Sequence, residues 1–272
     1  MTAHLRWATA VAALAAAAVS LACAGREPST PEAKKARGEE LIGKMSAQLA
    51  AAKSLSFTAV QTREEMRGQE RVKRIRTVHY AVTRPDKAHL TFQPQDGASS
   101  DVWYDGSRLT IVSHKEKYWA RGPMPNTLDA ALDAMATEYA IPTPVADLLY
   151  SSPRDAFVQT GSTGGWVARE AINGQMCERL SYQSPVVDWD LWIAEGERAL
   201  PCQLKITYKQ DPGAPTMTAV LKDWDLAASH GADEFIAKVD EQAYRRITLV
   251  RAPTAEPEPV KTTGAEVAPA KP

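Results

Sequence analysis

An excess of charge of either sign is missing from this sequence, and cysteine is scarce. Its 272 residues include 32 basic and 33 acidic side chains, for a formal net charge of −1 at pH 7. No global positive field therefore attracts nucleic acid, and we expect no nucleic-acid partner. Hydrophobic residues make up 44% and charged residues 24%, as in an average globular protein of one or two domains. The cysteines number only three, so their positions matter more than their count.

The familiar sequence motifs of catalysis are also absent. There is no HExxH, GxSxG or Walker motif. The glycine-rich segment 161–165 precedes a predicted strand rather than joining a strand to a helix, so a loop is the better interpretation. The histidines considered are His79, His89, His114 and His230. No two of them have the spacing of metal ligands. The sequence thus predicts a protein that is not an enzyme and has no metal or cofactor.

The N-terminus carries an uninterrupted apolar run. Arg6 is the only charged residue there, and the run from Trp7 to Val19 is short for a membrane crossing and rich in alanine. A basic start followed by a short apolar stretch and small residues is typical of an export signal. We therefore predict a signal peptide at 1–22 and a short tether at 23–30.

The end of this signal has two interpretations. Residues 19–23 resemble a bacterial lipobox, in which the cysteine is acylated and becomes the new N-terminus, whereas ordinary cleavage after Ala24 is the alternative. Lipidation of Cys23 would leave Cys177 and Cys202 as an even pair in an oxidising compartment, and we favour it for that reason. The lipid would anchor the chain to a membrane surface.

Cys177 and Cys202 are candidates for a disulfide, but a strand predicted at 187–195 lies between them. Two strand spacings would separate their backbones by about 9.6 Å, which exceeds the usual limit for a disulfide. A bond therefore requires that the strands splay or bulge there. The residues alone leave both the bonded and the free state open.

Most of the chain alternates between apolar and polar residues, which is typical of β-strands. Four such runs separated by short turns between residues 176 and 226 predict an antiparallel meander. Asp188 and Asp190 share one face of it, and we interpret them as solvent-facing residues rather than a paired-acid site. Further strands are predicted between residues 55 and 119, at 166–171 and at 235–239. A basic run should form a charged sheet edge rather than a phosphate site, namely Arg71, Lys73, Arg74 and Arg76.

Two segments have helical spacing instead. The first is capped by Thr30 and runs from residue 31 to 53, and the second runs from 126 to 140 and is followed by a short helical piece at 145–150. Residues 241–247 predict a single helical turn. The last segment, 251–272, has no aromatic residue and is rich in Pro, Ala and Glu, so we expect it to be disordered.

Five motifs lie along the chain in an order that is typical of one protein family. They are Arg84–Lys87, Trp103–Gly106, Ile141–Tyr150, Asp188–Ile193 and Leu200–Lys209. With them the chain resembles, over about residues 40–240, a family of predicted periplasmic proteins of unknown function related to the outer-membrane lipoprotein carrier and receptor (LolA/LolB-like) superfamily. The resemblance implies an α+β fold, an unclosed antiparallel β-barrel of about ten strands with helices covering its concave side. It also implies export to the periplasm of a Gram-negative bacterium and a domain spanning 31–250.

The superfamily's shared feature is an apolar cavity that accepts acyl chains. From the apolar alternation we predict eleven lining residues, namely Phe57, Tyr80, Phe92, Leu109, Ile111, Leu132, Met135, Leu191, Ile193, Leu204 and Ile206. The alternative is that these residues fill a solid core, because the period alone does not separate a lining from a core.

Two functions follow from the interpretation of the chain as a half-barrel with an apolar cavity. The first is a non-catalytic envelope protein that binds a lipid, an acyl chain or an acylated protein. The second, suggested by the regulators RseB and MucB of the same fold, is a sensing or interaction subunit that acts through a protein partner. A hydrolase is the least favoured reading, because no catalytic constellation supports it.

Overall fold

The computed structural model describes residues 27–252 except 142, 144, 159–160 and 232. The predicted signal peptide, the predicted lipidation site Cys23 and nearly all of the predicted C-terminal tail lie outside the described residues. None of the helices in the described part of the chain combines the length and apolarity that a membrane crossing requires.

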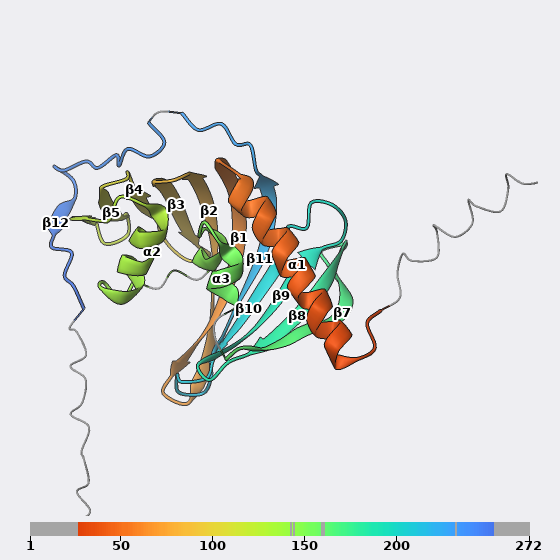
Figure 1. Cartoon of the computed structure of the whole chain (residues 1–272). Coiled ribbons are helices and arrows are strands. Elements are labelled where there is room, and N and C mark those ends of the chain that lie inside the picture. The colour runs from red at the N-terminus through yellow and green to blue at the C-terminus, as the bar shows by residue number, and fades with distance from the viewer. Residues whose placement is uncertain (1–26, 142, 144, 159–160, 232, 253–272) are drawn as a thin grey trace, which may run out of the picture.

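One twisted sheet forms the body of the protein (Figure 1). Its twelve strands lie in the order β12-β6-β5-β4-β3-β2-β1-β11-β10-β9-β8-β7. In chain order they are β1 (Ser54–Arg67), β2 (Glu70–Thr83), β3 (Lys87–Pro94), β4 (Ser100–Tyr104), β5 (Arg108–Ser113), β6 (Tyr118–Pro123), β7 (Thr163–Ile172), β8 (Gln175–Gln183), β9 (Val187–Ala194), β10 (Pro201–Tyr208), β11 (Thr216–Asp225) and β12 (Arg245–Ile247).

The sheet is an unclosed half-barrel, as predicted, with two strands more than the ten expected. Neighbours pair antiparallel within the described residues, except that β12 pairs parallel with β6. The four predicted strands of the meander are β8 to β11, and β11 returns to pair with β1 in the middle of the sheet. The predicted basic edge is wrong in part, because β2 pairs with β1 along its length and with β3 from Arg76 onward.

Helix α1 (Pro31–Ala51) lies on the concave face at the β7 end of the sheet (Figure 1). Thr30 caps it as predicted, because its side chain accepts a hydrogen bond from the Ala33 N–H at 3.1 Å. Helical spacing places four apolar residues on the buried side, namely Leu41, Ile42, Met45 and Leu49. Gly38 allows close contact, since a Cβ there would lie 2.9 Å from the Cα of Gly165 on β7.

The connection from β6 to β7 crosses the concave face from one edge of the sheet toward the other (Figure 1). This insert, residues 124–162, contains α2 (Leu128–Thr137), the 3₁₀ turn η1 (Ala146–Leu148) and α3 (Pro153–Phe157). The predicted helix at 126–140 is confirmed with shorter ends, and the piece at 145–150 is a 3₁₀ turn. Sequence periodicity missed α3, which is only five residues long.

The segment that follows β11 differs from its prediction. Residues 235–239 do not form a strand, and a strand, β12, occupies residues 245–247 where a helical turn was predicted. The physical reason is that residues 235–239 lie on the convex face of the sheet, where they pair with no strand. Ala237, Val239 and Tyr244 pack there against a buried cluster made of Trp103, Val112 and Trp119. Apolar alternation therefore marked a covering segment, not a further strand.

Candidate functional site

An apolar cavity lies between α2 and the concave face of β2 to β5. Its volume is about 50 Å³. Its lining is apolar apart from two tyrosines and one threonine, and comprises Tyr80, Ala88, Leu90, Phe92, Val102, Tyr104, Leu109, Leu128, Ala131, Leu132, Met135, Ile141, Thr143, Ala146 and Leu149. The strands contribute every second residue and α2 contributes positions three or four apart, which is how each element presents one face to the interior.

The cavity is nearly closed and nearly filled by its own walls. A volume of 50 Å³ compares with about 30 Å³ for each water in the liquid and with about 300 to 1,000 Å³ for pockets that hold drug-sized ligands. An acyl chain would therefore enter only after α2 moves away from the sheet.

The predicted lining residues separate into two groups. Tyr80, Phe92, Leu109, Leu132 and Met135 line the cavity, and Ile111 packs half-buried against the same core. The remaining five lie elsewhere, namely Phe57, Leu191, Ile193, Leu204 and Ile206.

The core holds most of that second group. Leu191, Ile193 and Leu204 are fully buried in β9 and β10, on the concave face but away from the lining of the cavity beneath α2. Phe57 stacks between the rings of Tyr80 and Trp224, at centroid distances of 4.3 and 4.1 Å. For these positions the solid-core alternative is the one that the structure supports.

Polar contacts at the rim hold the insert against the sheet. The Leu128 N–H donates to the Pro85 carbonyl at 2.8 Å, and the Tyr104 hydroxyl donates to the Pro125 carbonyl at 2.5 Å. An Arg84 N–H donates to the Tyr150 carbonyl at 3.0 Å. Each such bond contributes only about 1 kcal/mol net. The insert is thus held to the sheet by a few separate hydrogen bonds and by the packing of its apolar face, rather than by a continuous ladder.

The insert also contains conformations that cost free energy. Val145, a β-branched residue, has a φ of 76°, and Ala140 has a φ of 49°. Beside them Asp147 borders a small recess together with Phe157, Trp189 and Ile206. Burial raises the pKa of Asp147 to about 6, because the apolar surroundings disfavour its charge. The insert therefore contains two unfavourable backbone conformations and an acid whose charge is disfavoured.

A polar network on the convex face connects residues that sequence reasoning had treated as scattered. Asp101 accepts hydrogen bonds from Thr91 at 2.7 Å and from His114 at 2.7 Å, and it lies 3.1 Å from His89. His89 also contacts Glu234 at 2.7 Å. Although burial opposes its charge, the hydrogen bonds from His89, Thr91 and His114 lower the pKa of Asp101 to about 2.

This network attaches the segment after β11 to the sheet. Glu234 lies on that segment, and so does Tyr244, whose hydroxyl lies 2.8 Å from His114. Within the described residues no cluster of His, Cys, Asp and Glu has metal-binding geometry. The other acids singled out from the sequence make ion pairs, Asp188 with Lys209 at 2.8 Å and Asp190 with Arg179 at 3.3 Å.

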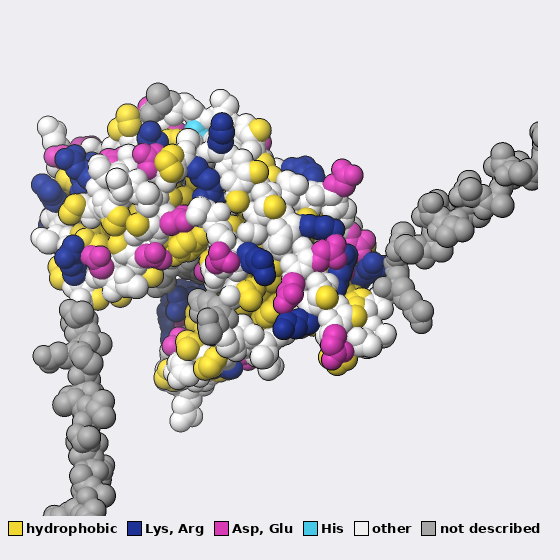
Figure 2. Space-filling view, viewed as in Figure 1, with side chains coloured by type: hydrophobic (Ala, Val, Ile, Leu, Met, Phe, Trp, Pro, Cys, Tyr) yellow, Lys and Arg dark blue, Asp and Glu magenta, His cyan; other side chains and the backbone are white. Residues whose placement is uncertain are grey.

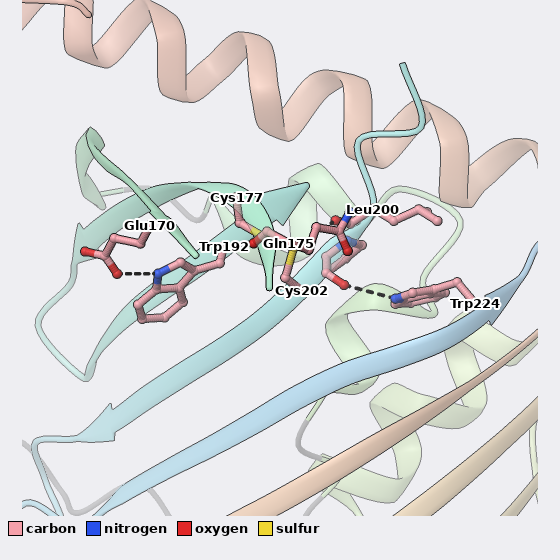
Figure 3. The surroundings of a disulfide bond; sticks show 8 residues. Glu170, Gln175, Cys177, Trp192, Leu200, Cys202 and Trp224 are labelled. Atoms are coloured by element: carbon pink, nitrogen blue, oxygen red, sulfur yellow. Dashed lines mark hydrogen bonds between the residues drawn. A yellow bond between two sulfur atoms is a disulfide. The ribbon is translucent and has the colours of Figure 1, made fainter. Parts of the chain in front are cut away.

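A disulfide joins Cys177 on β8 to Cys202 on β10. Their Cα atoms are 6.9 Å apart, closer than two regular strand spacings. The register between β9 and β10 shifts between Pro201 and Gln203, so Cys202 lies in the bulge that such a bond requires. Figure 3 shows the bond between the indoles of Trp192 and Trp224, which donate to Glu170 at 2.7 Å and to Pro201 at 2.9 Å.

Residues 38–249 match a family of predicted periplasmic proteins, DUF2092. The chain belongs to this family. The resemblance drawn from the sequence motifs is thereby confirmed, and the family's description gives its members as predicted periplasmic proteins. No functionally curated protein matches the chain.

Solved structures with a similar fold include a LolA superfamily protein, MucB and LppX. A LolA superfamily protein from Nitrosomonas europaea is 8% identical, with 74% of this chain and 98% of that one covered and a TM-score of 0.35. MucB is 13% identical, with 75% and 64% covered and a TM-score of 0.41. The lipoprotein LppX of Mycobacterium tuberculosis is 12% identical, with 70% and 97% covered and a TM-score of 0.40. At these identities the similarity concerns the fold alone.

Proposed function

We propose that this periplasmic family member is a non-catalytic binding protein for an acyl chain of a lipid or an acylated protein. The observation that carries the proposal is the apolar cavity beneath α2, closed by an insert that packs its apolar face inward and is hydrogen-bonded at its rim. In the closed form the cavity is smaller than an acyl chain requires. Its walls expand when α2 and the residues after it swing away from β2 to β5.

The free energies involved are of the right size for this opening. Each buried CH₂ group contributes about 0.8 kcal/mol. An acyl chain with about ten buried CH₂ groups would thus contribute about 8 kcal/mol. A few rim hydrogen bonds at about 1 kcal/mol each are well below that value. Opening also separates buried residues of the insert, such as Leu128, Leu132 and Met135, from the strands. In the proposal the acyl chain takes the place of the strands against these residues, so its burial offsets the loss of the rim contacts, whereas in the absence of a ligand the insert closes.

The position of the protein follows from its N-terminus in the same proposal. A signal peptide at 1–22 would export the chain, and acylation of Cys23 would anchor the domain 31–250 to a membrane surface through a short tether. Anchoring holds the cavity close to a source of acyl chains. A second candidate function, a sensor that acts through a protein partner, uses the same movement, since an outward swing of the insert changes the surface that a partner contacts.

Native mass spectrometry of the full chain purified from its own envelope tests the proposal. We expect an added mass equal to an acyl-chain compound. The variant Leu132→Trp should lose it, because the indole fills the cavity, whereas Val167→Trp, at an exposed position of β7, should retain it. A chain that purifies without any acyl compound, together with a stable protein partner, would support the sensor instead. Equal ligand content in both variants would contradict binding beneath α2.

A further inference from the structure

Two arginines lie on the concave face next to the cavity. Arg63 on β1 and Arg76 on β2 alternate in step with Phe57 and Tyr80, which places their side chains on the inner side of the sheet. They border a recess of about 200 Å³, whose other charged lining residues are Lys73, Arg74, Glu65 and Asp96. Figure 2 shows Lys and Arg side chains in the hollow beside the part of the molecule that contains α2.

A chain of contacts joins this recess to the apolar cavity. The Arg76 Nε–H donates to Oε1 of Gln61 at 2.8 Å, and the Gln61 amide donates to the Tyr80 hydroxyl at 3.1 Å. The Arg76 guanidinium also lies 4.9 Å from the centre of the Phe92 ring. Tyr80 and Phe92 are both cavity-lining residues. The recess thus adjoins the apolar cavity through these side chains.

The charges in the recess are not balanced. Within the described residues neither Arg63 nor Arg76 forms an ion pair, whereas Arg71 and Arg74 on the same hairpin pair with Glu64 at 2.7 Å and with Glu65 at 3.6 Å. Arg63 and Arg76 contact aromatic rings instead, Tyr208 in the case of Arg63. Burial lowers the pKa of Arg76, and the positive charge of Arg63 lowers it further. Two half-buried like charges are unfavourable until an anion joins them.

We propose that Arg63 and Arg76 bind the anionic headgroup of an amphiphile whose acyl chain enters the cavity beneath α2. This inference rests on the proposed function and adds the class of ligand, an amphiphile with a phosphate or carboxylate head. Guanidinium groups suit such heads because their parallel N–H groups match two oxygens at once. Gln61 keeps the Arg76 guanidinium in the recess, since its oxygen accepts from Nε and leaves the terminal N–H groups for the ligand.

Calorimetric titration of the delipidated full chain with three probes tests this proposal. The probes are 1-lauroyl lysophosphatidic acid, 1-lauroyl lysophosphatidylcholine and inorganic phosphate, each below its aggregation concentration. We expect the anionic lysolipid to bind at least about tenfold more tightly than the zwitterionic one, as charge-assisted hydrogen bonds predict. Phosphate alone should bind far more weakly than the anionic lysolipid, because it lacks the acyl chain.

Two double variants separate a site from a general field. Arg63→Gln with Arg76→Gln should bring the affinity ratio of the two lysolipids close to one while the zwitterionic lysolipid still binds, which also shows that the fold is intact. Arg71→Gln with Arg108→Gln removes the same charge from exposed positions outside the recess and should leave the ratio unchanged. If the first double variant fails to fold, Arg76→Lys is tested in its place. It retains the charge but lacks the parallel N–H groups of the guanidinium, so it should reduce the affinity ratio of the two lysolipids severalfold.

Three results would contradict the inference. Equal affinity of the unaltered chain for both lysolipids would remove the headgroup site and leave the proposed function standing. An equal loss of preference in the Arg71 and Arg108 pair would show a diffuse field instead of a site. Phosphate that binds as tightly as the anionic lysolipid would make this a site for a free anion. If neither lysolipid binds at all, the proposed function itself is wrong.

Discussion

The two halves of the concave face are built from the same alternating strands and differ in what covers them. Under α1 the interior is filled, with Leu49, Leu191 and Leu204 fully buried. Glycines at 38 and 165 bring helix and sheet into close contact. Under α2 a cavity of about 50 Å³ remains, and the covering insert is attached at its rim.

The fixed contacts are distributed in the same uneven way. On the α1 side, the buried carboxylate of Glu178 receives hydrogen bonds from Arg37 and from the Trp166 indole, and the disulfide joins β8 to β10. On the α2 side, Val145 has an unfavourable backbone conformation and Asp147 is a half-buried acid. The comparison suggests a rigid half that maintains the fold and an adjustable half that admits a ligand.

Truncation of one buried leucine in each half should give the largest difference in unfolding free energy. Leu191→Ala should cost about 4 kcal/mol of unfolding free energy, since its tightly packed surroundings do not collapse into the space. Leu132→Ala should cost about 2 kcal/mol, because α2 can settle toward the sheet. Urea unfolding with equal m-values measures both. Equal costs at the two sites would mean that the halves are equally rigid.

Loss of the disulfide should have the next largest effect. Cys177 and Cys202 are 25 residues apart in sequence, and a loop of that size is worth about 3 kcal/mol. We expect Cys177→Ala with Cys202→Ala to lower the unfolding free energy by about that amount. Affinity for an acyl probe should change less than about twofold, because the bond lies away from the residues that line the cavity. A tenfold weaker affinity would show that the rigid half controls the site.

Local pattern was enough to predict much of the rigid half. The cap at Thr30, the helix that follows it and the strands β8 to β11 all depend on residues close in sequence. The same pattern placed Leu191 and Leu204 on the correct face but in the wrong part of it. A period of two tells which side of a sheet a residue faces, and it does not tell which helix covers that position.

Long-range register explains what sequence reasoning missed. His89, Asp101 and His114 come together because β3, β4 and β5 pair in one register. The usable signal was a set of polar residues at outward positions of three successive strands. The bulge at Cys202 likewise depends on how β10 meets β9, and no local motif specifies it. The placement of Arg63 and Arg76 as diagonal neighbours on the inner face needed the register of β1 and β2.

The smallest expected effect concerns Asp147, which tests whether the insert is the weaker half. Its folded pKa of about 6 lies above the ordinary 3.8 of an aspartate. The folded state therefore binds the proton more tightly than the unfolded state. The contribution of Asp147 to stability should be greatest below about pH 4 and fall as the pH rises through 6, by at most about 3 kcal/mol in total.

Asp147→Asn should remove this fall, so the variant should be more stable than the unaltered chain at pH 7.5 by about 1 to 3 kcal/mol. Urea unfolding between pH 4 and 7.5 measures the effect, with Asp96→Asn on an exposed loop as the control. Because a more stable insert opens less often, the same variant should take up an acyl probe more slowly at neutral pH. A pH profile identical to that of the unaltered chain would show that the Asp147 charge is solvated, and that the insert is no weaker than the half beneath α1.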